Sequence, residues 1–206
     1  MYDIIKERIP LEKLIEDEKK VVFTTDKSYL IAYPEFLKYF ADLQEITKHD
    51  VVIGIHFTYG WMPRIFNFKS DKWEEVVYIL NRAKDGKSLS EADLEELSAC
   101  FNNSLVGVSK ILHFINPSSY AIWDSRVYQY LTGKNANQQT IHNYQSYLDY
   151  NRFSNEIASL PEFEPLHQSM VEKVGYTMTP LRSLELIMFK NGVASKADDP
   201  TSDSNA

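Results

Sequence analysis

The sequence of 206 residues predicts an all-α fold made of many helices. Apolar residues recur at helical spacing along most of the chain, and residues typical of helix ends divide it into about nine or ten segments. The β-like patch at Val21–Thr25 is too isolated to imply a sheet. We find no internal repeat, and the length suffices for one sizeable core or two small lobes.

Prolines mark the first expected helices. Residues 2–20 predict an amphipathic helix with a break near Pro10, because proline fits best in the first turn of a helix. Pro34 is expected to open a helix that runs to Ile46. Its inward-facing residues are expected to be Phe36, Leu37, Phe40 and Leu43.

Residues 51–59 form the next expected helix, with Asp50 as its cap. The segment is apolar almost all round, which predicts a buried helix, although its β-branched residues would also suit a strand. Gly60 is expected to reverse the chain and Pro63 to start a new element.

Capping signals also delimit the helices that follow. Asp71 and Glu74 resemble a capping box for a helix that runs to Lys84 and is closed by Gly86. Ser90 is expected to cap the next helix. That helix places Leu94, Leu97 and Phe101 on one face.

The C-terminal part predicts three or four more helices and a tail. Residues 138–160 form one long helix or two shorter ones, and Pro161 and Pro165 introduce a helix through Val174. A last helix is capped by Thr179, opened by Pro180 and closed by Gly192. We expect residues 1–193 to form one compact helical domain, or two lobes in which the N- and C-terminal helices pack together, and residues 194–206 to be disordered.

The central stretch 104–131 carries the most informative pattern. An apolar helical segment runs into the turn Asn116–Ser119, where Pro117 cannot continue the helix. A short extended piece, residues 120–123, leads to Asp124 at the start of a second apolar segment. Asp124 is well placed to cap that helix, because its carboxylate can accept the free amide hydrogens of the first turn.

Composition excludes several classes of protein. At 44% hydrophobic and 25% charged residues the chain is typical of a globular protein, and no apolar run approaches the roughly 20 residues of a membrane helix. One cysteine, Cys100, excludes an internal disulfide framework and cysteine-based zinc or iron–sulfur sites. We therefore expect a cytoplasmic protein without a metal or cofactor. The net charge of -7 argues mildly against nucleic acid as a partner, although the basic residues Lys110, Arg126 and Lys134 surround a single acid, Asp124.

Each candidate residue also has a purely structural interpretation. Spacing alone favours Asp124 as a helix cap, which is compatible with a catalytic role, and Lys110 as a lysine that reaches water from an apolar helix. His56 and His113 lie on apolar segments, where a histidine is usually a hydrogen-bonded core residue, and neither belongs to a metal-binding spacing. The large aromatic residues at turns suit either core packing or stacking on nucleobases, and they are Tyr59, Trp61 and Trp123. Arg182 and Glu185 are spaced for an ion pair within one helix.

The order of residues in this stretch resembles the helix-hairpin-helix DNA glycosylase superfamily. The likeness consists of Gly107-Val108, then Lys110, an apolar helix, Pro117, an extended piece and Asp124 followed by Val127. It is closest to bacterial proteins with the 8-oxoguanine DNA glycosylase fold, of which several share the turn Tyr-Gly-Trp-Met-Pro found at residues 59–63. The second glycine of the family's hairpin is absent here, and the stretch from lysine to aspartate is about one helical turn shorter.

The resemblance implies a two-lobed fold with a helix-hairpin-helix-like element, a groove between the lobes and a DNA glycosylase activity in repair or anti-phage defence. Its partner would be double-stranded DNA with a modified base. Asp124 would be the catalytic acid and Lys110 the nucleophile of a bifunctional enzyme. Gly107 and Ser109 of the hairpin, with Arg126 and Lys134, would contact DNA phosphates, while the aromatic residues and His56 and His113 would line the site. The rival interpretation is a non-catalytic helical DNA- or protein-binding module.

Overall fold

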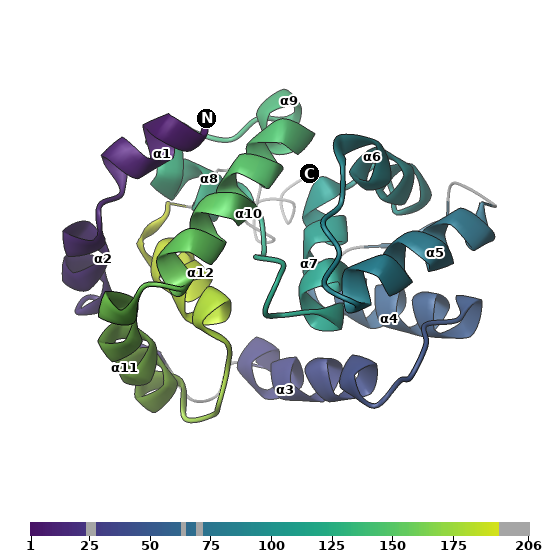
Figure 1. Cartoon of the computed structure of the whole chain (residues 1–206), viewed down its shortest axis with the longest axis horizontal. Helices are drawn as coiled ribbons and strands as arrows, with labels where there is room; N and C mark the ends of the chain where they lie inside the picture. Colours follow the sequence, from purple (N-terminus) through teal and green to yellow (C-terminus); the bar gives the residue numbers. More distant parts are fainter. Residues whose placement is uncertain (24–27, 63–64, 69–71, 194–206) are drawn as a thin grey trace, which may run out of the picture. The chain divides into compact units, whose positions relative to one another are not determined.

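The computed structural model describes residues 1–23, 28–62, 65–68 and 72–193. These residues form twelve α-helices and one short 3-10 helix, and they contain no strand beyond an isolated β-bridge between Phe68 and Phe101 (Figure 1). The all-α class is therefore confirmed. The chain divides into two compact units, which we call the terminal unit (Met1–Phe23 and the part from Trp123 onward) and the central unit (the intervening part, up to Ile122).

The terminal unit is built from both ends of the described chain. Its α-helices are α1 (Tyr2–Arg8), α2 (Leu11–Glu18), α8 (Ser125–Thr132), α9 (Gln138–Ile141), α10 (Tyr144–Ala158), α11 (Glu164–Val174) and α12 (Pro180–Asn191), with the 3-10 helix η1 (Pro161–Phe163) before α11. Helix α12 is the core of this unit, because every residue from Leu181 to Met188 is buried and the helix packs against α2, α8, α10 and α11.

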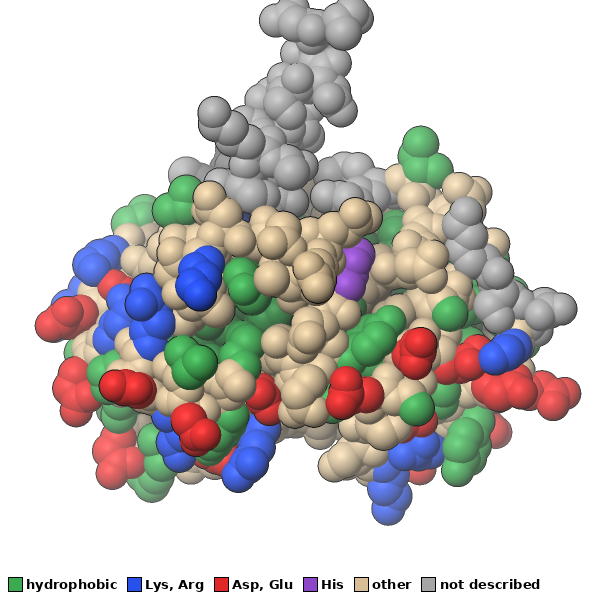
Figure 2. Space-filling view, turned by 90° about the horizontal axis from the view of Figure 1, so that it is seen from above, with side chains coloured by type: hydrophobic (Ala, Val, Ile, Leu, Met, Phe, Trp, Pro, Cys, Tyr) green, Lys and Arg blue, Asp and Glu red, His purple; other side chains and the backbone are tan. Residues whose placement is uncertain are grey.

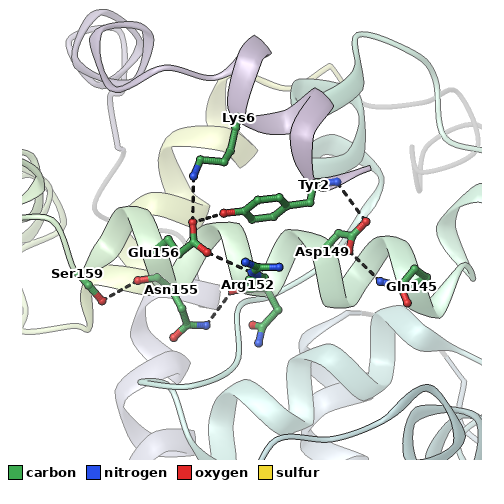
Figure 3. Close-up of polar contacts among 9 residues, drawn as sticks. Tyr2, Lys6, Gln145, Asp149, Arg152, Asn155, Glu156 and Ser159 are labelled. Carbon is green, nitrogen blue, oxygen red and sulfur yellow. Dashed lines mark hydrogen bonds and ion pairs between the residues drawn. The ribbon is translucent and has the colours of Figure 1, made fainter.

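Polar contacts hold the first helix of the chain onto α10 (Figure 3). The Tyr2 hydroxyl donates a hydrogen bond to the Glu156 carboxylate, which also pairs with Lys6 at 3.3 Å. About two turns earlier in α10, the Asp149 carboxylate accepts the backbone N–H of Tyr2 at 3.1 Å. The apolar face of α1 contributes Ile5 to the core beneath these contacts. The start of the chain is thus anchored to a helix that lies far away in sequence.

The central unit is a bundle organised around α7. Its helices are α3 (Ser28–Ala41), α4 (Lys48–Trp61), α5 (Trp73–Lys84), α6 (Glu91–Cys100) and α7 (Leu105–Ile115). Helix α7 packs against each of the other four helices. Apart from Val106 and Lys110, all its residues are buried, as expected for a helix that is apolar on nearly every side.

The expected helix from Pro34 to Ile46 is wrong at both ends. Helix α3 already begins at Ser28, so Pro34 lies inside it, at a cost of about 3 kcal/mol for a lost backbone hydrogen bond and a steric clash. The turns before Pro34 bury Leu30 and Tyr33, and this tertiary burial outweighs the local cost. The helix ends at Ala41, and the backbone of Ile46 is held by the Asn81 side chain of α5, with two hydrogen bonds of 2.8 Å.

Helix α4 confirms the helix interpretation of residues 51–59 but corrects both of its expected ends. The cap is Thr47, and Asp50 is its capping-box partner, accepting the Thr47 backbone N–H at 2.9 Å. Gly60 does not reverse the chain, since the helix continues through it to Trp61.

Most other local signals agree with the structure. Pro10 separates α1 from α2, Ser90 caps α6 in a capping box with Asp93, and Thr179 caps α12. Helix α5 ends at Lys84 before Gly86, and residues 138–160 form two helices. Asp71, Pro63, Thr24 and Thr25 and the tail 194–206 lie outside the described residues.

Candidate functional site

Asp124 is the N-cap of helix α8, in the terminal unit. Its backbone is extended (φ -155°, ψ 179°), and its carboxylate oxygen Oδ1 accepts the backbone N–H of Val127 at 2.9 Å. The side chain is half-buried. Its other oxygen, Oδ2, accepts no hydrogen bond from any residue that the structure describes. The capping interpretation of Asp124 is therefore confirmed, and capping occupies only one of its two oxygens.

Buried tyrosines of α10 lie behind this cap. Tyr150 is completely buried, and its ring lies 5.2 Å from that of Trp123, the residue before Asp124. Burial raises the pKa of the Tyr150 phenol well above its usual value, and the negative charges of Glu185 and Asp124 raise it further. Tyr150 therefore stays protonated close to the Asp124 carboxylate. In the sequence, the i, i+3, i+6 spacing of Tyr144, Tyr147 and Tyr150 indicates that these tyrosines share one helix face. It does not indicate that Tyr150 lies near Asp124.

Lys110 lies on α7, in the central unit. Its side chain is half-buried, and its ammonium lies 5.7 Å from the ring centre of Trp61. The Trp61 ring is held by a hydrogen bond from its Nε1 to the Tyr29 carbonyl at 3.0 Å, and it packs edge-on against Phe114. The structure thus brings together two residues that the sequence proposed separately. Asp124 belongs to the other unit.

The predicted hairpin at Gly107–Lys110 is wrong. These residues lie within α7, and the turn that joins α6 to α7 is Phe101–Ser104, where Asn102 and Asn103 have positive φ angles of 56° and 52°. The amide of Gly107 is used by the Ser104 side chain at 3.1 Å, and the buried Ser109 hydroxyl donates to the Val106 carbonyl at 2.9 Å. The roles predicted for Gly107 and Ser109 in phosphate binding therefore do not fit their positions.

The aromatic candidates divide into core residues and an accessible one. Tyr59 is buried in the central unit, and its hydroxyl donates to the Phe101 carbonyl at 2.9 Å. Trp123 is fully buried in the terminal unit. Core packing therefore describes both, and stacking on an extruded base does not. Trp61 is half-buried, unlike the other two.

The two histidines have different surroundings. His113 is buried between the Tyr33 hydroxyl, 2.8 Å from its Nε2, and the Tyr120 carbonyl, 2.6 Å from its Nδ1. Nδ1 donates to the Tyr120 carbonyl and Nε2 shares a hydrogen bond with the Tyr33 hydroxyl, so His113 is a hydrogen-bonded core residue, as its apolar segment indicated. His56 is exposed, and its ring packs against Phe66 and Phe68. The core interpretation is therefore wrong for His56.

The basic candidates lie on the surface of the terminal unit. Arg126 is half-buried, with its guanidinium 4.8 Å from the ring centre of Phe189, and Lys134 is exposed. On the face of the molecule shown in Figure 2, Lys and Arg side chains are mixed with Asp and Glu side chains. The expected ion pair of Arg182 with Glu185 is present and buried in α12.

The comparisons with known proteins give no assignment. No protein-family model, curated protein or solved structure matches the chain. Within the described ranges we find no cluster of His, Cys, Asp and Glu side chains suited to a metal ion. Nor does any helix in these ranges have the length and apolar character needed to cross a membrane.

Proposed function

We propose that this protein excises a base from duplex DNA, with Asp124 as the catalytic carboxylate. The observation that carries the proposal is the placement of Asp124: it follows α7, a turn and an extended segment, and it caps α8 through Oδ1 while Oδ2 accepts no hydrogen bond among the described residues. This is the order of elements that the sequence resemblance implies around a glycosylase aspartate.

The chemistry needs a carboxylate that is fixed and still available. A base inside the duplex is out of reach, so the nucleotide must flip into a pocket at a cost of a few kcal/mol of unstacking. As the bond from base to sugar breaks, positive charge develops on the sugar. Asp124 would stabilise this charge and activate a water molecule through the oxygen that capping leaves available.

Lys110 offers a second, covalent route. As a neutral amine it would attack the sugar carbon that carries the base, the bond to the base would break and the base would leave, and opening of the sugar ring would give a Schiff base that permits strand cleavage. This step requires the amine to lose its proton, whereas the Trp61 ring beside the half-buried Lys110 favours the charged ammonium. The lyase step is thus a separate part of the proposal.

A second candidate is a non-catalytic DNA- or protein-binding module in which Asp124 acts only as a cap. The internal hydrogen bonds of Gly107 and Ser109 favour it, because they remove the expected phosphate-binding hairpin, as does the net charge of -7. Salt distinguishes a DNA-binding protein from a protein-binding module: binding to DNA phosphates weakens steeply between about 50 and 200 mM salt, whereas a protein-binding module gives no duplex binding to weaken. Base release then distinguishes the enzyme from a non-catalytic DNA-binding module.

The decisive experiment measures abasic-site formation on a panel of duplexes and modified phage DNAs, with borohydride present to trap a lysine adduct. We expect Asp124→Asn to keep its fold, since Asn also caps well, and to lose base release about 100-fold or more. The matched control is Asn143→Asp, an amide–carboxylate exchange at the N-cap of α10, which should retain activity.

Each outcome decides a different part of the proposal. A trapped adduct that disappears in Lys110→Ala would establish the covalent route, while base release without trapping would leave Asp124 and water. Full activity in Asp124→Asn would contradict the catalytic assignment. No base release on any substrate would favour the binding module.

A further inference from the structure

We propose that Trp123 is a positioning residue that fixes the direction of the Asp124 carboxylate. The Trp123 side chain is itself held in place by a cluster of aromatic side chains, Tyr128, Tyr147 and Tyr150. This inference rests on the proposed function for its catalytic consequence, but the positioning itself can be measured in the free protein. All the residues involved belong to the terminal unit.

The Trp123 side chain is held from several elements. Its ring lies edge-on to Tyr128 of α8 at 5.8 Å and tilted against Tyr147 and Tyr150 of α10 at 6.5 and 5.2 Å. Its indole N–H donates to the Ile141 carbonyl at 2.9 Å, in the last turn of α9. A carbonyl there has no partner within its own helix, so the indole satisfies it. With its side chain fully buried, Trp123 has little freedom to rotate.

The fixed orientation of the Trp123 side chain constrains the direction of the neighbouring Asp124 side chain. Asp124 is extended, and in an extended chain consecutive side chains point to opposite sides. An indole locked into the core therefore turns the next side chain away from it, where the carboxylate is half-buried rather than fully enclosed. The hydrogen bond from Val127 to Oδ1 then fixes which carboxylate oxygen faces the helix.

The contacts also explain why a large aromatic residue is needed at this position. A smaller side chain would leave the three tyrosine rings without a common partner and the Ile141 carbonyl without its donor. Buried polar groups that lose a partner are costly, so the extended segment would shift to compensate. A displacement of about 1 Å at a reacting group can lower a rate about 100-fold.

The test compares variants by the coupling of the Val127 amide to Asp124. In the wild-type protein the NMR chemical shift of this amide should follow the ionisation of Asp124, because the two groups are hydrogen-bonded. We expect Trp123→Phe to reduce the amplitude of this titration by half or more, and to slow single-turnover base release by about tenfold or more with unchanged affinity for duplex DNA.

Further variants separate positioning from general destabilisation. Tyr150→Leu removes the ring closest to Trp123 and should reduce the Val127 titration as Trp123→Phe does. Tyr150→Phe keeps the ring and should show the wild-type titration. The matched control is Tyr130→Phe on α8, the helix that Asp124 caps. It removes a buried hydroxyl that donates to Asp17 at 2.8 Å, and it should leave the Val127 titration unchanged.

The inference fails if Trp123→Phe and Tyr150→Leu keep the full Val127 titration, or if Tyr130→Phe reduces it equally. Absence of base release in the wild-type protein would instead contradict the proposed function. The two failures are distinguishable, because the titration of Val127 needs no substrate.

Discussion

At the scale of single residues, the packing around Gly107 gives this glycine a structural role in place of the DNA-binding role that was expected. A Cβ atom at this position would lie 2.7 Å from the Tyr59 hydroxyl oxygen, closer than real contacts allow. Tyr59 is buried and donates its hydroxyl to Phe101, so it cannot move without losing that bond. Glycine is required here for the close approach of α4 and α7, and this requirement explains a glycine that the sequence alone attributed to a DNA-binding hairpin.

We expect Gly107→Ala to destabilise the protein by about 1–3 kcal/mol, the usual cost of overpacking a core, although alanine has the higher helix propensity. The measurement is urea denaturation at neutral pH. The control is Gly60→Ala in α4, where a Cβ would meet nothing within 4 Å, and this variant should gain roughly 0.5–1 kcal/mol. Equal stability of the two variants would contradict the packing assignment.

At the scale of elements, the turn between α6 and α7 is Phe101–Ser104, not the expected hairpin at Gly107. Asn102 and Asn103 both adopt left-handed backbone conformations there. Asn102 also uses its side chain, which donates to the Ile65 carbonyl at 3.0 Å and accepts the Asn67 N–H at 3.1 Å. Asn103 is exposed and contributes only its backbone conformation among the described contacts.

The two asparagines should therefore respond differently to glycine. Asn103→Gly should stabilise the protein by about 1 kcal/mol, because glycine adopts this conformation without strain. Asn102→Gly removes the same backbone strain but loses two hydrogen bonds, each worth about 1 kcal/mol. This variant should therefore be no more stable than the wild type. Thermal unfolding of both variants checks this, and a higher melting temperature for Asn102→Gly than for Asn103→Gly would refute the assignment.

At the scale of the whole molecule, the two ends of the described chain meet at Asp17. Its carboxylate accepts hydrogen bonds from Lys13 at 2.7 Å, Lys20 at 2.6 Å and the Tyr130 hydroxyl at 2.8 Å, and its backbone carbonyl accepts one from Asn191 at 3.1 Å. Helices α2, α8 and α12 are thus joined at one residue. Burial by itself raises the pKa of Asp17, but the hydrogen bonds outweigh it and hold the pKa below its ordinary value of 3.8.

A lowered pKa in the folded state has a defined consequence for acid stability. The contribution of Asp17 is fully present above pH 3.8, its ordinary value, and is lost as the pH falls through the lower folded value. We expect Asp17→Asn to cost about 2 kcal/mol at pH 7, as for other hydrogen bonds to charged groups, and the difference from the wild type to shrink below about pH 4.

Denaturant unfolding at pH 7, 5 and 3 would measure this difference. Glu12→Gln, which removes one negative charge at an exposed position of the same helix, is the control for the change in net charge. A constant difference between Asp17→Asn and the wild type at all three pH values would show that the carboxylate charge does not contribute.

The sequence by itself determined the all-α class, the breaks at Pro10 and Gly86, the caps Ser90, Asp124 and Thr179, and the ion pair of Arg182 with Glu185. These features depend on neighbours within a few residues, so local chemistry suffices to predict them. The expected groove between lobes and the activity stay predictions.

The tertiary structure alone decided what depends on distant partners. It placed Pro34 inside a helix, because burial of Leu30 and Tyr33 outweighs a local penalty. It put Lys110 beside Trp61 and set Trp123 among the tyrosines behind Asp124. Helical spacing shows that a residue faces inward, but not which residues it meets there, because packing joins segments far apart in the chain.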